Sequence, residues 1–118
     1  MSLTVVVNLT HQAGATLELE FGVADQDGNP ANITGAICRF VVARNPSAEH
    51  VLTTEGTSAN VTATITDAVG GIYRMLAEAE ETEGLSGTFD WETWVEDLSG
   101  GKSKPTKGVI TFERGLLP

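Results

Sequence analysis

The chain has 118 residues, of which 41% are hydrophobic, and its mean hydropathy is −0.01. These values predict one globular domain over residues 1–118. The formal net charge of −9 argues against nucleic acid and against an anionic membrane surface as partners, because both are bound through basic patches. Membrane insertion is not expected either, since no stretch approaches the ~20 consecutive apolar residues of a membrane helix.

Cysteine usage indicates a reducing compartment. Cys38 is the only cysteine, so no disulfide can form within the chain. The first ten residues hold no lysine or arginine, and their apolar run is too short for a secretion signal. We therefore expect a protein made in the cytoplasm, with Cys38 packed as a reduced and buried thiol.

Alternating hydrophobic residues predict the first strands. Residues 3–10 are rich in β-branched side chains, which favour a strand. Residues 15–24 alternate with period two, and Leu17, Leu19 and Phe21 fall on one face. This alternation predicts a strand that is buried on one side.

The segment 25–32 is typical of a turn, because it contains Asp-Gly and Asn-Pro pairs. Asp25, Asp27 and Asn29 also lie at every second position, as they would at the start of a calcium loop. The glycine comes too early for that pattern, and no glutamate stands at the twelfth position. A plain turn is the main interpretation, and calcium binding is the alternative.

Four further strands are predicted at 35–44, 50–55, 60–66 and 71–78. In the first of them, Cys38, Phe40 and Val42 form the expected core face. In the last, either Tyr73 with Met75 or the alternate residues face the core, and the sequence leaves this open. The segment near 78–84 is the only helix-compatible one, and we expect a single helical turn that crosses between two sheets.

The stretch 88–97 is predicted to be the central strand. Its alternation places Phe89, Trp91, Thr93 and Val95 on one face and Asp90, Glu92, Trp94 and Glu96 on the other. A basic, glycine-rich loop is expected at 98–108, a last strand at 108–114, and an apolar end at 115–118. About eight short strands with turns between them predict an all-β, antiparallel β-sandwich of 7–9 strands. The predicted core comprises Leu17, Leu19, Phe21, Phe40, Val61, Ile65, Leu85, Phe89, Trp91, Val95, Ile110 and Phe112.

No residue pattern indicates catalysis, a metal or a cofactor. His11 is expected in a turn and His50 at the start of a short strand, and neither has an evident partner in sequence. One cysteine and two histidines at no ligand spacing do not form a zinc site. A phosphate-binding glycine loop before a helix is missing too. We therefore expect neither an enzyme nor a cofactor-binding protein, although a small hydrolase remains an alternative to test.

Two clusters of charge are candidate interaction sites. Half of the sixteen acidic residues lie between residues 78 and 97, and all the lysines lie between residues 102 and 107. These clusters are either solvated faces or an assembly surface, where an acidic face meets a basic segment of a neighbouring copy. Trp94 lies among carboxylates, so it either packs under a neighbouring segment or anchors a partner chain or a sugar ring. The candidate interaction residues are Trp94, Glu92, Glu96, Lys102, Lys104 and Lys107.

The order of several short motifs carries a resemblance. The alternating strand and Asp-Gly turn lead into Ile33-Thr34-Gly35-Ala36; further motifs follow at 62–67, 71–73, 81–85, 87–91 (Gly-x-Phe-x-Trp), 95–97 and Gly108. This order resembles the immunoglobulin-like β-sandwich modules of tailed-phage baseplate and tail proteins, most of all the N-terminal domain of upper baseplate proteins. Such modules usually carry tyrosine where this chain has Phe89, so the corner hydrogen bond of that hydroxyl is not available here.

The resemblance implies a non-enzymatic structural module of a phage or prophage virion. Such a module would be made in the bacterial cytoplasm and then assembled into the virion, with copies of itself and other phage structural proteins as partners. The alternative is a β-sandwich module that binds carbohydrate or a cell surface, with Trp94 exposed as a stacking platform and a glycan as its ligand.

Overall fold

The computed structural model describes residues 5, 6, 8–25, 27–97 and 101–114, except for the side chains of residues 5, 6 and 102–105. The predictions for residues 98–100 and 115–118 lie outside this description. The elements in chain order are β1 Val5–Val6, β2 Leu9–Gln12, β3 Leu17–Gly22, β4 Ile37–Ala43, β5 His50–Thr53, β6 Val61–Asp67, β7 Ile72–Ala77, α1 Ala79–Thr82, β8 Gly87–Glu96 and β9 Lys102–Glu113.

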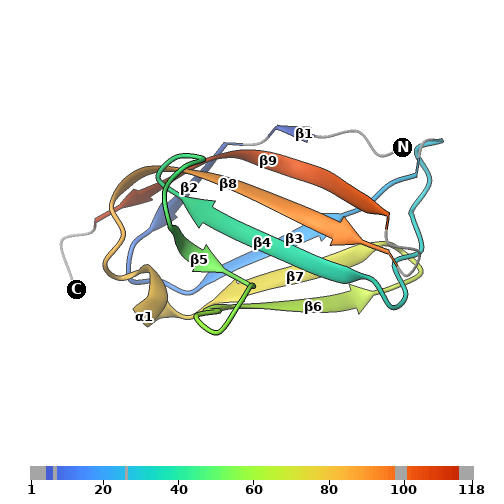
Figure 1. Ribbon diagram of the computed structural model, residues 1–118, viewed down its shortest axis with the longest axis horizontal. Coiled ribbons are helices and arrows are strands. Elements are labelled where there is room, and N and C mark those ends of the chain that lie inside the picture. Colours follow the sequence, from blue (N-terminus) through green and yellow to red (C-terminus); the bar gives the residue numbers. More distant parts are fainter. Residues whose placement is uncertain (1–4, 7, 26, 98–100, 115–118) are drawn as a thin grey trace.

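The strands form two sheets that pack face to face (Figure 1). Sheet A has the order β1-β9-β8-β4-β5, with β2 also paired to β9, and sheet B has the order β3-β7-β6. In an immunoglobulin fold, the second, fifth and fourth strands lie side by side in one sheet, and the last two strands lie in the other sheet. From β3 onward the chain follows this arrangement, so the predicted all-β, immunoglobulin-like sandwich is confirmed.

The N-terminal strands depart from the predicted antiparallel pairing. Both β1 and β2 run parallel to β9. The backbone N–H of Ala13 extends this contact to the carbonyl oxygen of Glu113 (2.8 Å). Gly14 then turns the chain into sheet B. Its φ of +86° is a backbone conformation that residues with a side chain disfavour. Both N-terminal strands, β1 and β2, therefore lie beside β9 in sheet A, and the chain crosses to sheet B at this turn.

Two predicted boundaries were wrong. The N-terminal pairing runs to Gln12, so His11 lies in β2 rather than in a turn, and its ring packs edge-on against Phe112. The last strand begins at Lys102, six residues before the predicted start. It includes Pro105, because the register shifts between Thr93 and Val95 and leaves two residues of β9 opposite one of β8. Such a bulge tolerates a proline that a regular ladder would not.

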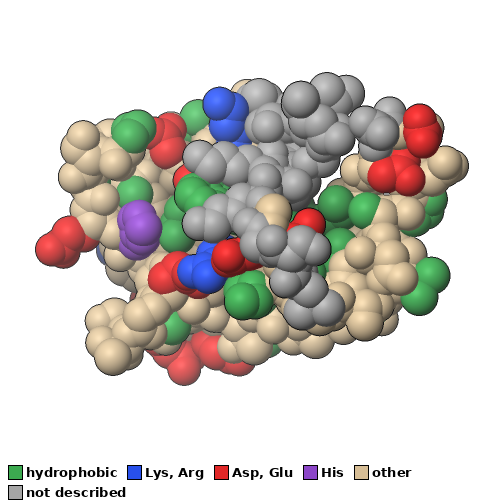
Figure 2. Space-filling view, turned by 45° about the vertical axis from the view of Figure 1, so that its right-hand side comes forward, with side chains coloured by type: hydrophobic (Ala, Val, Ile, Leu, Met, Phe, Trp, Pro, Cys, Tyr) green, Lys and Arg blue, Asp and Glu red, His purple; other side chains and the backbone are tan. Residues whose placement is uncertain are grey.

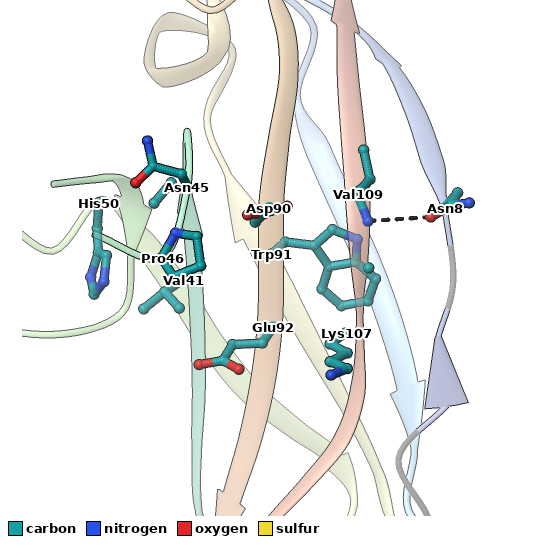
Figure 3. Close-up of a pocket in the computed structure, with 12 residues that line it drawn as sticks. Asn8, Val41, Asn45, Pro46, His50, Asp90, Trp91, Glu92, Lys107 and Val109 are labelled. Atoms are coloured by element: carbon teal, nitrogen blue, oxygen red, sulfur yellow. Dashed lines mark hydrogen bonds between the residues drawn. The ribbon is translucent and has the colours of Figure 1, made fainter. Parts of the chain in front are cut away.

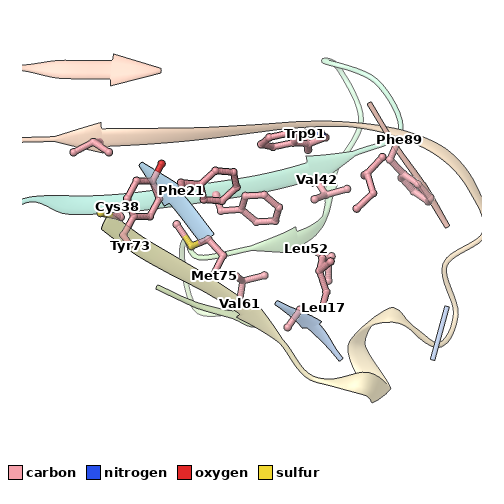
Figure 4. Packing of buried hydrophobic residues seen from close by; sticks show 14 of the residues in the cluster. Leu17, Phe21, Cys38, Val42, Leu52, Val61, Tyr73, Met75, Phe89 and Trp91 are labelled. Atoms are coloured by element: carbon pink, nitrogen blue, oxygen red, sulfur yellow. The ribbon is translucent and has the colours of Figure 1, made fainter. Parts of the chain in front are cut away.

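The core lies between the sheets as one cluster (Figure 4). Of the twelve predicted core residues, nine are buried, and Leu19, Ile65 and Leu85 are partly buried against the cluster. The open question in β7 is resolved, because Tyr73 and Met75 are buried and the alternate residues point outward. The predicted alternation of β8 is also confirmed, since its buried residues are Phe89, Trp91, Thr93 and Val95.

A buried polar contact joins the two sheets through this core. The hydroxyl of Tyr73 on β7 lies 2.7 Å from Thr93 Oγ1 on β8, and both residues are fully buried. Thr93 donates its own hydroxyl proton to the carbonyl oxygen of Arg39 on β4 (2.9 Å). Tyr73 is therefore the donor to Thr93. Burial raises the pKa of Tyr73 well above its ordinary value, so the phenol keeps its proton.

The predicted helical turn near 78–84 is confirmed as α1, which carries the chain from sheet B to sheet A. Thr82 at its end is fully buried. Its Oγ1 accepts a hydrogen bond from the backbone N–H of Gly14 (3.1 Å) and donates to the carbonyl oxygen of Ala15 (2.8 Å). The side-chain hydrogen bonds of Thr82 thus stabilise this corner. Position 89 is phenylalanine, so no tyrosine hydroxyl is available there to form a corner hydrogen bond.

Replacement of Trp91 tests the central strand. Trp91 is 3% exposed and packs against Phe21 and Phe40, whereas its indole Nε1 has no hydrogen-bond partner among the described residues. We expect Trp91→Ala to lower the free energy of unfolding by about 3–5 kcal/mol. Trp91→Phe should cost less, because it keeps an aromatic ring and removes an unpaired donor. Urea unfolding measures both, and an unchanged Trp91→Ala midpoint would contradict the central role of β8.

Alkaline pH should destabilise the fold through Cys38. Burial raises the pKa of this thiol from 9.0 to about 11. The unfolded chain therefore loses this proton first. The contribution of Cys38 to the free energy of unfolding should be constant below pH 9 and fall between pH 9 and about 11, by roughly 1.4 kcal/mol per unit. Cys38→Ala should remove this part of the decline. If the free energy of unfolding, measured in urea, declines equally with pH in the parent and in Cys38→Ala, this contribution of Cys38 is excluded.

Candidate interaction face

The side chains of sheet A that point away from the core form one surface, which we call the outer face of sheet A. It results from the alternation of β4, β8 and β9, whose other side chains fill the core. Its described members include Ile37, Arg39, Val41, Ala43, Thr88, Asp90, Glu92, Trp94, Glu96, Lys107, Val109 and Thr111. Of the six residues that the sequence singled out, Glu92, Trp94, Glu96 and Lys107 therefore lie on one face.

The strand register brings residues of opposite charge together on this face. Arg39 stands opposite Trp94, and Glu92 stands between Val41 on β4 and Lys107 on β9. Trp94 thus has a guanidinium on the neighbouring strand, although its neighbours along the chain are acidic. It is half-buried rather than fully exposed. Figure 2 shows side chains of both charges lying next to one another, with hydrophobic side chains close by.

Arg39 connects three segments of this face. Its guanidinium makes ion pairs with Glu55, which follows β5, and with Glu96 of β8 (Nη2 to Oε2, 3.0 Å). The hydrogen bond to Glu55 is the main cause that raises the pKa of Arg39, and Glu96 adds to it. All three side chains are partly exposed. The acidic residue Glu96 is therefore already balanced within the fold.

The basic candidates lie in β9. Lys107 is exposed and stands opposite Glu92. The backbone of Lys102 pairs with Glu96, and Lys104 belongs to the bulged part of the strand. The side chains of Lys102 and Lys104 lie outside the described residues. The sequence placed these lysines in a loop, but the structure places all three in the strand next to the acidic residues of β8.

A hollow of about 440 Å³ opens on the outer face of sheet A (Figure 3). It lies over Ala43, which stands between His50 on β5 and Asp90 on β8 in the register. A small side chain in this row leaves space, and the segment after β4 borders it. The lining residues are Asn8, Val41, Ala43, Asn45, Pro46, His50, Asp90, Trp91, Glu92, Lys107, Gly108 and Val109.

The far wall of the hollow is held by the N-terminal segment. Asn8 Oδ1 accepts a hydrogen bond from the backbone N–H of Val109 (3.4 Å), which is drawn in Figure 3. Sequence reasoning missed Asn8, Asn45, Pro46 and His50. Nothing local to them indicated a site, because only the pairing of β2, β5 and β9 with their neighbours brings them together.

The chemistry of the hollow is suited to recognition. Asp90 and Glu92 offer carboxylates, Asn8 and Asn45 offer amides, and the valines and Pro46 offer apolar walls. No hydroxyl or thiol side chain is found among its described lining residues. The site can therefore form hydrogen bonds, charge pairs and apolar contacts with a partner surface.

The structure also bears on the calcium alternative and on membrane spans. Asp25 Oδ1 accepts hydrogen bonds from the backbone N–H groups of Asp27 (2.9 Å) and Asn29 (3.0 Å), which is the geometry of a turn. Within the described ranges, no three acidic, histidine or cysteine side chains gather as a metal-binding group. Among the same residues, no helix is long and apolar enough to cross a membrane, since α1 spans four residues.

Comparison with known proteins finds a likeness among solved structures. No family model matches the sequence, and no curated protein matches it. Among solved structures, Tim-1 is similar over 97% of this chain and 97% of its own, with 12% sequence identity and a TM-score of 0.48.

Proposed function

We propose that the protein is a non-enzymatic structural module of a phage or prophage virion, in its baseplate, tail or fibre. In this proposal it associates with copies of itself and docks to other virion proteins through the outer face of sheet A. It is made in the bacterial cytoplasm and then incorporated into the virion. The motif order supports the virion assignment, and the geometry of the outer face of sheet A supports docking.

One observation carries the docking proposal. Trp94, Glu92, Glu96 and Lys107 were chosen from the sequence alone, and the strand register gathers them on one face around Arg39. A half-buried tryptophan surrounded by both charges is typical of an interaction anchor. A chain with a net charge of −9 repels its own copies at long range, so contact needs local cations such as Lys107 on the face.

The hollow favours carbohydrate binding as a second candidate function. Sugar hydroxyls pair well with carboxylates and side-chain amides, and Asp90, Glu92, Asn8 and Asn45 supply these groups around one cavity. Trp94 lies on the same face and would supply the stacking ring. This alternative requires a small glycan as ligand rather than a protein surface.

Docking through this face should change the fluorescence of Trp94. As the protein concentration rises, association should bury Trp94 further and shift its emission to shorter wavelength, while the mass measured by light scattering increases. Trp94→Phe should abolish the shift, because Trp91 is already buried. Trp94→Ala and Lys107→Glu should weaken association about tenfold or more. Thr16→Ala, an exposed change just before β3 and outside the outer face of sheet A, is the matched control.

The outcomes separate the two functions. A concentration-independent monomer with constant emission would contradict docking between copies through this face. A glycan-dependent emission shift that is lost in Trp94→Ala and Asp90→Asn, with hits on a glycan array, would favour the carbohydrate alternative. Equal behaviour of Trp94→Ala and Thr16→Ala in both assays would exclude a role for Trp94.

A further inference from the structure

The strand β6 leaves an open edge on sheet B. It pairs with β7 on one side, and on its other side no strand follows in the part of the chain that the structure describes. In Figure 1 it runs along the lower edge of the sandwich. Residues 61–66 contain no charged residue, proline or glycine. Their unpaired backbone groups therefore form a template for another strand, without the residues that normally prevent such pairing.

The edges at β5 and β3 are protected. On β5, the backbone N–H of Thr53 donates to Asn60 Oδ1 (2.8 Å), and Asn60 Nδ2 donates to the carbonyl oxygen of Val51 (2.9 Å). The backbone N–H of Asn60 also donates to the carbonyl oxygen of Thr53 (2.9 Å). On β3, Glu18 and Glu20 are exposed along the outer face of sheet B. Charged side chains of this kind discourage pairing at an edge.

We propose that β6 pairs with β6 of a second copy, antiparallel and with Thr64 opposite Thr64 on a twofold axis. The two three-stranded sheets then form one continuous sheet. This adds a second surface to the self-association in the proposed function, on which it rests, and this surface is separate from the outer face of sheet A.

The sequence of β6 is self-complementary in this register. Thr62, Thr64 and Thr66 are exposed on the outer face, while Val61, Ala63 and Ile65 face the core. Centring on Thr64 places Thr62 opposite Thr66 and Ala63 opposite Ile65, and threonine pairs across strands are favourable. Centring on Ala63 would instead place Thr66 opposite Asn60, whose side chain already closes the edge of β5.

The charges of sheet B also favour a second copy. Glu18 and Glu20 lie on β3, which is the strand farthest from β6, and Asp67 at the end of β6 accepts a hydrogen bond from the backbone N–H of Gly70 (2.9 Å). The row of Thr64 continues to Arg74 on β7 and then to Glu20. The two Arg74 side chains would be separated by three strand spacings of about 4.8 Å, beyond the Debye length at physiological salt. The paired residues 62–66 therefore add no charge to the contact where two copies of charge −9 approach each other.

A charge-swap pair at Thr64 tests this register. The wild-type chain should sediment as a dimer, and Thr64→Lys and Thr64→Glu should each be monomeric, because each would place like charges opposite themselves. An equimolar mixture of the two variants should recover a dimer of one copy each. Thr64→Val, which stays uncharged and keeps the strand propensity, should remain dimeric. Circular dichroism checks that every variant is folded.

The results distinguish this inference from the docking face. A wild-type monomer at every concentration, or dimers of Thr64→Lys and Thr64→Glu as stable as the wild type, would overturn it. So would a mixture that fails to recover the dimer. Loss of association in Trp94→Ala but not in Thr64→Lys would overturn the β6 pairing and leave the docking face in place. Loss in Thr64→Lys with constant Trp94 emission would support β6 and contradict docking between copies.

Cross-linking provides a measurement that does not depend on added charge. In a Cys38→Ala chain, Thr64→Cys should form an intermolecular disulfide under mild oxidation, because Cβ atoms of directly opposite residues lie about 4.5–5.5 Å apart. Thr66→Cys, an exposed threonine on β6 itself, is the control and should cross-link far more slowly, because the register places it opposite Thr62 of the other copy. Equal rates for the two positions would overturn the proposed pairing.

Discussion

The buried contact of Tyr73 with Thr93 determines how the two sheets meet. The phenol of β7 in sheet B donates to a threonine of β8 in sheet A, which in turn donates to the backbone of β4. An unpaired hydroxyl in this core would cost about 1–3 kcal/mol, so only one register of β8 against β7 satisfies all three groups. The apolar residues around it give most of the stability, and this contact selects the alignment.

The same register fixes the interaction face. Because side chains alternate along a strand, Thr93 in the core requires Glu92 and Trp94 to point outward. A slip by one residue would exchange the two faces and bury these polar groups. The bulge opposite Trp94 then aligns the rest of β9, so that Lys107 meets Glu92. The core contact and the outer face are thus two results of one alignment.

Strict alternation made β3, β4 and β8 predictable, including which residues of each enter the core. The start of β9 was not predictable from local signals, because Pro105 and the lysines are typical of a loop, and only pairing with β8 makes them a strand. His11 was misplaced for the same reason, since its strand exists through contact with β9. The outer face of sheet A was predictable in part, because its charged residues lie on one alternating stretch. The hollow was not predictable, because it depends on three separate segments.

The two proposed surfaces have different consequences for assembly. A contact of β6 with its own copy is isologous, so it closes on itself and yields only pairs. Its free energy comes from backbone hydrogen bonds, and Asn60 directs it to β6 because it closes the edge of β5. The outer face of sheet A acts through side chains and lies on the other sheet of the sandwich. Pairs can therefore be connected into a larger structure only through a second surface of this kind, which gives each surface a separate role.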